Sequence, residues 1–361
     1  MVDSWTPYVS WMKRAPQITY NLMGSNLLHC QVEDLPGARE RLELDGFHED
    51  GYPPFLEAIA ERYGVSVDQV SSATGTSGAN FLVGAGLLRP GDEVLVERPA
   101  YDPLLAIPRF MGCEIRRFDR VFDDGFQADP ERVAAAMTPK TRLIILTNLH
   151  NPTGALTSVD RLRAVGEVAE RVGARVHVDE VYLESVPGEV PPSAASLSPT
   201  FISTASLTKA YGLSGIRAGW ILAAPELTER FKRVRDIVDG VGVFASELLG
   251  SIAFENLPAL RRRARGILDP NFSILQDFMK VRPELEWVPP GGGSVGFPRI
   301  RGVEDVSSFV EILRERYDTG VVPGRFFEAP GHFRVALGGK KEILEEGLRR
   351  LGNALDKELA S

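Results

Sequence analysis

The stretch Ser206–Trp220, SLTKAYGLSGIRAGW, places a serine, a lysine and an arginine among closely spaced glycines. Its first four residues form an S-x-x-K tetrad, a spacing that two unrelated chemistries use. In one, Ser206 is an acylated nucleophile and Lys209 is its base; in the other, Lys209 holds a cofactor covalently and Ser206 contacts the cofactor's phosphate. The glycines at 212, 215 and 219 predict tight turns rather than a helix.

An acylated serine needs a second S-x-N or Y-x-N element and a K-T-G-like strand. In this sequence no asparagine has a serine or tyrosine two positions before it, and neither K-[ST]-G nor H-[ST]-G occurs. Lys209 follows an apolar run at 200–204, where desolvation would lower its pKa and suit covalent chemistry. Arg217, eight positions later, offers a two-pronged donor for a phosphate, although either cation alone is more typical of a solvated loop.

The composition is that of an ordinary globular protein, with 43% hydrophobic and 25% charged residues in 361, and the length suits two domains. A net charge of −8 argues against general affinity for nucleic acid or for a membrane surface, so we expect a small-molecule partner. Cys30 and Cys113 have no disulfide or metal-ligand spacing, and we expect reduced thiols, a cytoplasmic location and no metal. We find no signal peptide and no run of the roughly 18 apolar residues that span a membrane.

Between about residues 55 and 225, short apolar runs alternate with segments of helical period. The runs lie at 93–97, 142–148, 174–180, 200–204 and 218–224, and the helical segments at 53–64, 129–137 and 158–173. This alternation predicts an α/β fold with a mostly parallel central sheet and helices on both faces. The later elements do not alternate, so we predict a large domain over 46–265 and a smaller α+β domain from 1–45, including an N-terminal arm, and 266–361.

Polar residues follow several apolar runs, at the strand ends where α/β proteins bind ligands. Gly75, Thr76 and Ser77 lie in a turn before an apolar helix, where backbone amides can bind an anion. The turn matches neither the P-loop nor the dinucleotide-binding motif, so it can also be interpreted as an ordinary helix cap without a ligand. Asp179 lies where the strand predicted within 174–180 ends. A buried carboxylate there needs a cationic partner or a capping role, and an acidic residue in a loop is an equally good interpretation.

Taken together, these motifs resemble those of the class I/II aminotransferases, pyridoxal-phosphate enzymes of fold type I. In chain order they are the Gly/Thr/Ser turn, P-x-Y at 99–101, N-P-T-G at 151–154, D-E-x-Y at 179–182, S-x-[ST]-K at 206–209, the arginine at 217 and a late F-R at 333–334. The resemblance extends from about residue 18 to the end and is greatest to the aspartate aminotransferase-like branch. It implies a homodimer with active sites at the subunit interface.

The resemblance also implies how pyridoxal 5′-phosphate is held. Lys209 forms a Schiff base with the cofactor and moves the substrate's α-proton, and Asp179 pairs with the pyridine nitrogen. Tyr182 and Asn151 hydrogen-bond the 3′ oxygen of the ring, and Tyr101 stacks on its face. The phosphate is bound by Gly75, Thr76, Ser77, Ser206 and Arg217.

Three residues are implied to bind the substrate. Arg334 grips its α-carboxylate, Asn151 contributes to the same site, and Gly24 belongs to the turn at 21–26 that closes over it.

The sequence departs from the family pattern at two places. Many relatives carry a tyrosine that reaches the phosphate of the neighbouring subunit, but the nearest aromatic residue here is Phe47, which has no hydroxyl. This puts the cross-subunit contact in doubt or leaves it to His48 or Tyr52. His150 stands where an asparagine is common; a loop histidine is more often solvated, and we assign it no role.

The expected activity is transfer of the amino group of an L-amino acid to a 2-oxo acid. The segment at 239–251, which we expect to line the side-chain pocket, contains no cation, so we expect a neutral or apolar substrate side chain. The alternative is another pyridoxal-phosphate enzyme acting on an amino acid: a lyase, synthase, decarboxylase or oxidase. A non-catalytic regulator would need an appended DNA-binding domain, and we recognise none in the 361 residues.

Overall fold

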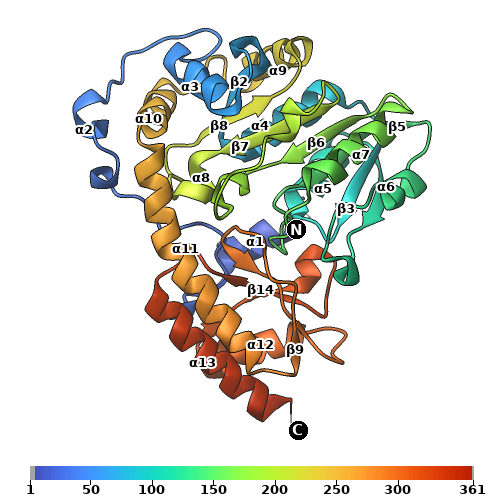
Figure 1. Ribbon diagram of the computed structural model, residues 1–361, viewed down its shortest axis with the longest axis vertical. Helices are drawn as coiled ribbons and strands as arrows, with labels where there is room; N and C mark the ends of the chain where they lie inside the picture. The colour runs from blue at the N-terminus through green and yellow to red at the C-terminus, as the bar shows by residue number, and fades with distance from the viewer. Residues whose placement is uncertain (1–4, 360–361) are drawn as a thin grey trace.

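In the computed structural model, residues 5–359 are described, and a seven-stranded sheet lies at the centre of the larger part of the molecule (Figure 1). Its strand order is β2-β8-β7-β6-β5-β3-β4. The strands are β2 (Val70–Thr74), β3 (Glu93–Arg98), β4 (Glu114–Asp119), β5 (Thr141–Thr147), β6 (Arg175–Asp179), β7 (Phe201–Ser206) and β8 (Ala218–Leu222). Strand β8 runs antiparallel to both of its neighbours, and the other pairs are parallel. The predicted α/β fold is confirmed.

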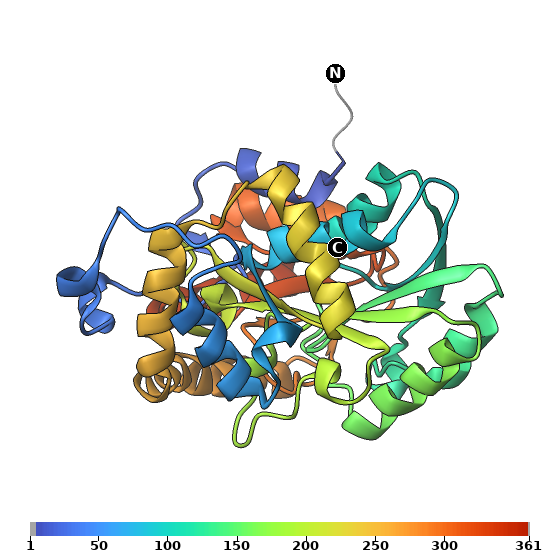
Figure 2. The ribbon, with the colours of Figure 1, turned by 90° about the horizontal axis from the view of Figure 1, so that it is seen from above.

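Helices cover both faces of this sheet, as Figure 2 shows from above. The alternation along β5 gives the reason: Leu143 and Ile145 pack with α5, whereas Ile144 and Leu146 pack with α7 on the other face. A strand covered on both sides reads as a continuous apolar run. The helices are α3 (Pro53–Tyr63), α4 (Gly75–Leu87), α5 (Asp102–Phe110), α6 (Pro130–Ala136), α7 (Val159–Glu170), α8 (Leu207–Tyr211), α9 (Pro225–Val238) and α10 (Phe244–Glu255).

A second hydrophobic core lies beneath the sheet in the view of Figure 1. The long helix α11 (Leu257–Lys280) packs there with α12 (Ser307–Tyr317) and α13 (Lys341–Glu358). Short strands complete this part: β1 (Tyr20–Asn21), β9 (Leu285–Glu286), β10 (Val295–Gly296), β11 (Arg299–Ile300), β12 (Thr319–Gly320), β13 (Val322–Pro323) and β14 (Phe333–Ala336). Because α11 runs unbroken past residues 265 and 266, where we placed the domain boundary, that division stays a prediction.

The N-terminal segment joins the two parts. Helix α1 (Pro7–Arg14) precedes β1, which pairs in parallel with β12, and α2 (Ala38–Arg41) lies further along the same segment. Residues 20–28 thus pack with the second core, since Leu22 and Leu27 belong to it. The segment then leads into α3 and the central sheet.

One local prediction is wrong. The glycines of the 206–220 stretch predict turns without a helix, but residues 207–211 form the short helix α8. The helix ends at Gly212, whose φ of +74° is in the left-handed region that glycine adopts without strain. The remaining residues, 213–217, make the predicted turn before β8.

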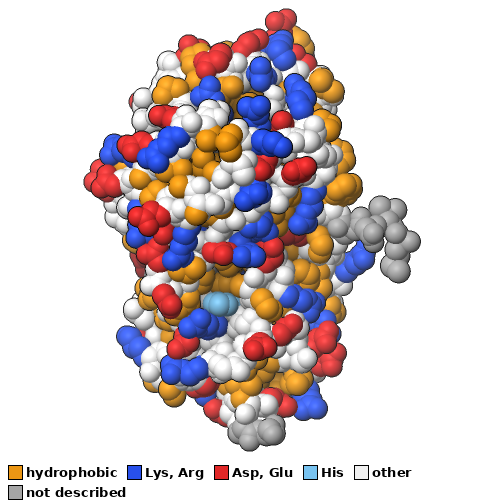
Figure 3. Space-filling model, turned by 90° about the vertical axis from the view of Figure 1, so that its right-hand side faces the viewer, with side chains coloured by type: hydrophobic (Ala, Val, Ile, Leu, Met, Phe, Trp, Pro, Cys, Tyr) orange, Lys and Arg blue, Asp and Glu red, His pale blue; other side chains and the backbone are white. Residues whose placement is uncertain are grey.

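The surface carries charges of both signs. On the face in Figure 3, lysine and arginine side chains alternate with aspartate and glutamate, with hydrophobic side chains between them. Among residues 5–359, no helix is both long and apolar enough to cross a membrane.

Candidate active site

The carboxyl ends of three neighbouring parallel strands bring the predicted polar segments together. Thr147 at the end of β5 pairs with Asp179 at the end of β6, and Asp179 pairs with Thr204 in β7. The segments that follow these strands therefore emerge at one edge of the sheet. In Figure 1 this edge faces the elements around β14.

Asp179 is buried and has polar partners. Its Oδ2 accepts a hydrogen bond from Nδ2 of Asn80 at 2.8 Å, and its Oδ1 accepts one from the amide of Val181 at 3.1 Å. Burial raises the pKa of the carboxyl group, and these two hydrogen bonds and the charge of Lys209 oppose the rise. Buried Asp179 is therefore stabilised by two amide hydrogen bonds as well as by the charge of Lys209.

Asn80 belongs to a buried network that our sequence reasoning missed. Its Oδ1 accepts a hydrogen bond from Oγ1 of Thr204 at 2.6 Å, and that hydroxyl lies 3.0 Å from Nε2 of His177. Asn80 lies in the middle of helix α4, just before its apolar half, and His177 interrupts an apolar strand. Polar residues inside apolar runs were the available signal.

Lys209 lies on α8, and its amine points at the N-terminal segment. Nζ donates hydrogen bonds to Oγ of Ser25 at 2.9 Å and to Oδ1 of Asn26 at 2.6 Å. Burial, and after it the positive charge of Arg334, lower the pKa of Lys209 to about 7 against the opposing charge of Asp179. A large fraction of this amine is therefore neutral near pH 7, as nucleophilic and general-base chemistry requires.

The first turn of α4 lies beside Arg217 and Ser206. Oγ1 of Thr76 donates to Oγ of Ser206 at 2.8 Å, and both residues are buried, whereas Ser77 is exposed. Gly75 has φ +68°, and a Cβ there would lie 2.3 Å from Nη2 of Arg217. The glycine thus lets the guanidinium reach a helix N-terminus, where free amides and the helix dipole favour an anion.

Arg334 of β14 is fully buried, and its hydrogen-bond partners are neutral oxygens. Nη1 donates to Oδ1 of Asn151 at 3.1 Å, and Nη2 donates to the carbonyl of Met23 at 3.3 Å and to the hydroxyl of Tyr8. Among residues 5–359, Nε has no hydrogen-bond partner and no carboxylate forms an ion pair with this guanidinium. A buried cation without an anion is costly, so this arrangement suits an anionic ligand.

Two tyrosines flank this space. The hydroxyl of Tyr182 donates to the carbonyl of Ser25 at 3.3 Å, and burial raises the pKa of Tyr182 to about 12. Tyr101 is partly buried, with its ring 5.9 Å from that of Tyr8. Gly24 has open space around its Cβ position, and its neighbours Ser25 and Asn26 make the contacts with Lys209. The role of Gly24 stays a prediction.

Residues 25–351 match the family model of aminotransferase class I and II. The chain belongs to this family. Its cofactor is accordingly pyridoxal 5′-phosphate, and the chain is a pyridoxal-phosphate-dependent enzyme.

Individual relatives include two aminotransferases and a synthase. The chain is 30% identical to the arginine–pyruvate transaminase of Pseudomonas aeruginosa over 82% of its own length and 78% of the relative's. It is 28% identical to the capreomycidine synthase of Streptomyces vinaceus, over 79% of this chain and 74% of that one. A crystal structure of a pyridoxal-phosphate-dependent aminotransferase from Streptococcus suis superposes with a TM-score of 0.91, at 28% identity and 99% coverage of both chains.

The donor set at the sheet edge fits this cofactor. The helix start at Gly75, beside the Arg217 guanidinium, suits a phosphate, and the buried carboxylate of Asp179 suits a protonated ring nitrogen. Asn151 uses its oxygen for Arg334, which leaves its amide group to donate elsewhere.

The expectation of a solvated histidine at 150 is wrong. His150 is fully buried; Nδ1 lies 2.8 Å from Oγ1 of Thr153 and Nε2 lies 3.0 Å from the carbonyl of Pro99. Burial and the charge of Arg120 hold its pKa well below the ordinary value. Arg120 itself pairs with buried Glu97 at 2.7 Å. The histidine is a neutral structural support of the loop that carries Asn151.

Phe47 is exposed, and it belongs to a group of apolar side chains on two adjoining segments. A Cβ on Gly46 would lie 2.3 Å from the ring of Phe244, so the chain at Gly46 lies against the start of α10. The exposed members of this group are Leu42, Leu44, Phe47, Ile237, Val238 and Val243. We call them the apolar surface group.

Proposed function

We propose that this aminotransferase transfers the amino group of an L-amino acid with a neutral or apolar side chain to a 2-oxo acid. One observation carries the proposal: among residues 5–359, the buried Arg334 guanidinium bonds neutral oxygens only and its Nε has no partner, and its charge lowers the pKa of Lys209. An amino acid bound by its carboxylate at Arg334 would therefore present its α-carbon near an amine that can accept a proton.

Pyridoxal phosphate supplies an aldehyde that reacts with amines and a ring that takes up the electron pair when a bond at the α-carbon breaks. We propose that Lys209 holds it covalently and Asp179 keeps its ring nitrogen protonated, with Asn80 orienting the carboxylate. Tyr182 and Asn151 would donate to the ring's 3′ oxygen, and Tyr101 would cover the ring. The phosphate would be held by Gly75, Thr76, Ser77, Ser206 and Arg217.

The residues of this chain divide the remaining work between them. Arg334 binds and orients the substrate carboxylate, and Asn151 fixes that guanidinium through its Oδ1. Lys209 would move the proton away from the substrate's α-carbon, which its lowered pKa permits at neutral pH. Closure by the turn at 21–26 would exclude water from the site.

The preference for a neutral side chain rests on the surroundings of Arg334. Tyr8 and Phe327 place aromatic rings 5.1 and 4.9 Å from the guanidinium, and Tyr8 packs against Tyr101. The segment at 239–251, which we expected to line the side-chain pocket, contains no cation for a distal carboxylate, and its Asp239 and Glu247 accept hydrogen bonds from Thr74 and Tyr52. Aromatic walls favour an apolar side chain.

A substrate panel tests the proposal. Purified enzyme with 2-oxoglutarate and single amino acids should turn over leucine, methionine or phenylalanine faster than aspartate. Faster turnover of aspartate would contradict the side-chain preference. The variant Lys209→Ala should neither hold the cofactor covalently nor turn over any of them.

A second candidate function is a synthase or another non-transaminating reaction on an amino acid, because one relative in the same similarity range is a capreomycidine synthase. The two differ in stoichiometry. Without an amino acceptor, a transaminase yields one 2-oxo acid per active site and stops. Continued product formation under these conditions would favour the second candidate.

We also propose a cytoplasmic homodimer with active sites at the interface. The apolar surface group, in which Leu44 is 84% and Ile237 85% exposed, is the face we assign to the second subunit. Light scattering should give twice the monomer mass, and Phe47→Asp should lower it. A monomeric wild type would contradict this assembly. A second subunit seated there leaves the choice between His48 and Tyr52 for the phosphate contact open.

A further inference from the structure

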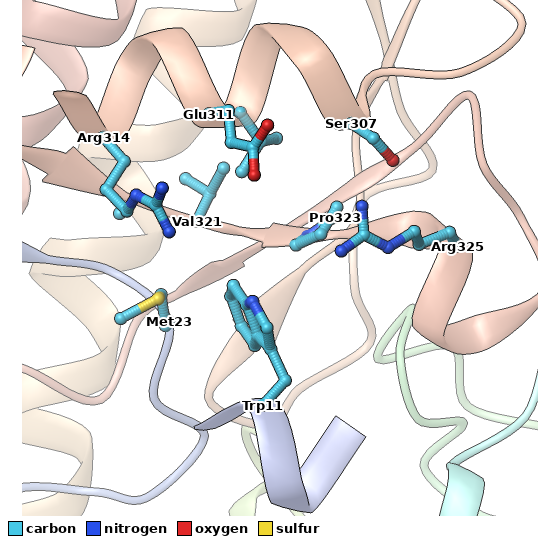
Figure 4. Close-up of a pocket in the computed structure, with 10 residues that line it drawn as sticks. Trp11, Met23, Ser307, Glu311, Arg314, Val321, Pro323 and Arg325 are labelled. Carbon is cyan, nitrogen blue, oxygen red and sulfur yellow. The ribbon is translucent and has the colours of Figure 1, made fainter. Parts of the chain in front are cut away.

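Helix α1 lies across the boundary between the central sheet and the second core, next to Arg334. On one side, the amide of Tyr8 donates to Oδ2 of Asp102 in α5 at 2.6 Å. On the other, the ring of Trp11 lies 5.0 Å from that of Phe326 in η6 (Gly324–Phe327), beyond β13. Figure 4 shows the Trp11 ring rising from α1 between Met23 and Pro323, in a small cavity. Both halves of the molecule therefore hold α1.

Asp102 anchors α1 through its amino end. Its carboxylate accepts hydrogen bonds from the amides of Tyr8 and Val9, which are unbonded donors of a first helical turn. The side chain is largely buried at the junction, and burial raises its pKa to about 6. A desolvated carboxylate that accepts two amides is a specific attachment rather than a chance surface contact.

Tyr8 projects from this anchored helix to Arg334. Its hydroxyl accepts a hydrogen bond from Nη2, and its ring centroid lies 5.1 Å from the guanidinium carbon. It is 95% buried, since its relative exposure is 5%, and it packs against Phe327 with 5.4 Å between rings. The contact joins residues 326 positions apart in the chain.

The guanidinium is consequently fixed in one orientation. Asn151, Met23 and Tyr8 take hydrogen bonds from Nη1 and Nη2, and Nε remains as the buried donor without a partner. Of these contacts the one to Met23 is long, at 3.3 Å. A carboxylate that approaches on the Nε side can therefore accept a hydrogen bond from Nε. It can accept a second one from Nη2 in place of the Met23 carbonyl.

We propose that Tyr8 is a positioning residue for the substrate carboxylate: held by Asp102 through α1, its neutral hydroxyl fixes Arg334 so that Nε faces the ligand. The inference rests on the proposed role of Arg334. A neutral partner suits this task, because a carboxylate at position 8 would neutralise the guanidinium, whereas a hydroxyl orients it and leaves its charge for the substrate. The ring of Tyr8, beside Tyr101, also bounds the space for the substrate side chain.

The first test measures carboxylate binding without turnover. Holoenzyme is titrated calorimetrically with 4-methylpentanoate, a monocarboxylate without an amino group. Tyr8→Phe, which keeps the ring, should weaken binding by about tenfold or more, because a hydrogen bond to a charged group is lost. Tyr20→Phe is the matched control, since Arg350 lies 4.2 Å from the Tyr20 ring in the second core, and it should bind like the wild type.

The second test follows the anchor. In Asp102→Ala, trypsin should cut after the exposed Lys13 and Arg14 several times faster, and carboxylate binding should weaken as in Tyr8→Phe. Asp102→Asn keeps a capping oxygen and should restore both. In steady-state kinetics, Tyr8→Phe should raise KM for the amino acid and change kcat much less, which a general loss of structure would not do.

The outcomes separate the two proposals. Equal carboxylate affinity in wild type and Tyr8→Phe, or tighter binding in the variant, overturns the role of Tyr8. Failure of wild-type holoenzyme to bind the carboxylate overturns it together with the role of Arg334. Carboxylate binding without transamination of any amino acid overturns the proposed reaction and leaves the role of Tyr8 to be decided by the comparison with Tyr8→Phe.

Discussion

The amine of Lys209 should react with pyridoxal phosphate in its neutral form at neutral pH. Burial and the charge of Arg334 lower its pKa from 10.5 to about 7. At pH 7 about half of such amines are neutral, against roughly one in 3000 for a lysine at its ordinary pKa. Because only the neutral amine attacks an aldehyde, the rate of attachment should rise with pH, reach half its maximum near pH 7 and level off above about pH 8.

The assay mixes apoprotein with the cofactor between pH 6 and 10 and follows absorbance by stopped flow. Borohydride reduction and peptide mass spectrometry then locate the attachment at Lys209. A rate that still rises about tenfold per unit between pH 8 and 10 would show an amine close to its ordinary pKa, and the reasoning from burial would be wrong.

Two variants test the cause of the shift by its sign. Arg334→Met removes a positive charge that lowers the pKa of Lys209, so the midpoint should move to higher pH. Asp179→Asn removes a negative charge that raises this pKa, so the midpoint should move to lower pH. Arg301→Met is the control, because this exposed arginine is not among the charges that shift Lys209, and it should leave the midpoint in place.

Three further predictions follow from buried contacts. Asn80→Leu removes the amide that bonds Asp179, so the acid limb of the kcat profile should move about one pH unit higher; an unmoved limb would show that this hydrogen bond does not tune the carboxylate. Gly75→Ala forces a Cβ to within 2.3 Å of Arg217 at a φ of +68°, so the dissociation constant of the phosphate cofactor should rise about tenfold or more in equilibrium dialysis, and an unchanged constant would argue against a phosphate there. His150→Ala removes the ring that contacts two buried oxygens and leaves a cavity, so the free energy of unfolding in urea should fall by about 2–4 kcal/mol, whereas a loss below about 0.5 kcal/mol would mean that the loop does not depend on it.

The sequence alone was enough for the architecture, and it pointed to the segments that meet at the candidate site, whose roles stay predictions. Runs such as residues 142–148 are apolar at every position because a parallel strand is covered on both faces, and β5 has that environment. The polar segments that follow these strands lie together, since parallel strands deliver their carboxyl ends to one edge of the sheet. The position in the chain was therefore enough to select three candidate residues, Lys209, Asp179 and Asn151.

Other features depend on residues far apart in the sequence, and no local pattern encodes such contacts. Asn80 reaches Asp179 across 99 positions, and Tyr8 reaches Arg334 across 326. His150 likewise contacts the carbonyl of Pro99, which is 51 positions away in the chain. The sequence around His150 is typical of a solvated loop and does not indicate this contact. Strand β8 runs antiparallel to β7 after the turn that begins at Gly212. The glycines predicted that a turn occurs there, but they did not predict the direction of the next strand.

The stretch SLTKAYGLSGIRAGW shows where the division falls. Spacing and residue type determined that the lysine follows one strand and the arginine precedes the next. Local periodicity is enough for this, because it indicates where strands begin and end. Only the tertiary structure decided that Lys209 has a pKa of about 7, that Arg217 reaches the amino end of α4, and that Arg334 keeps one donor free. Those properties come from desolvation and from charges brought close by packing, and both depend on the fold as a whole.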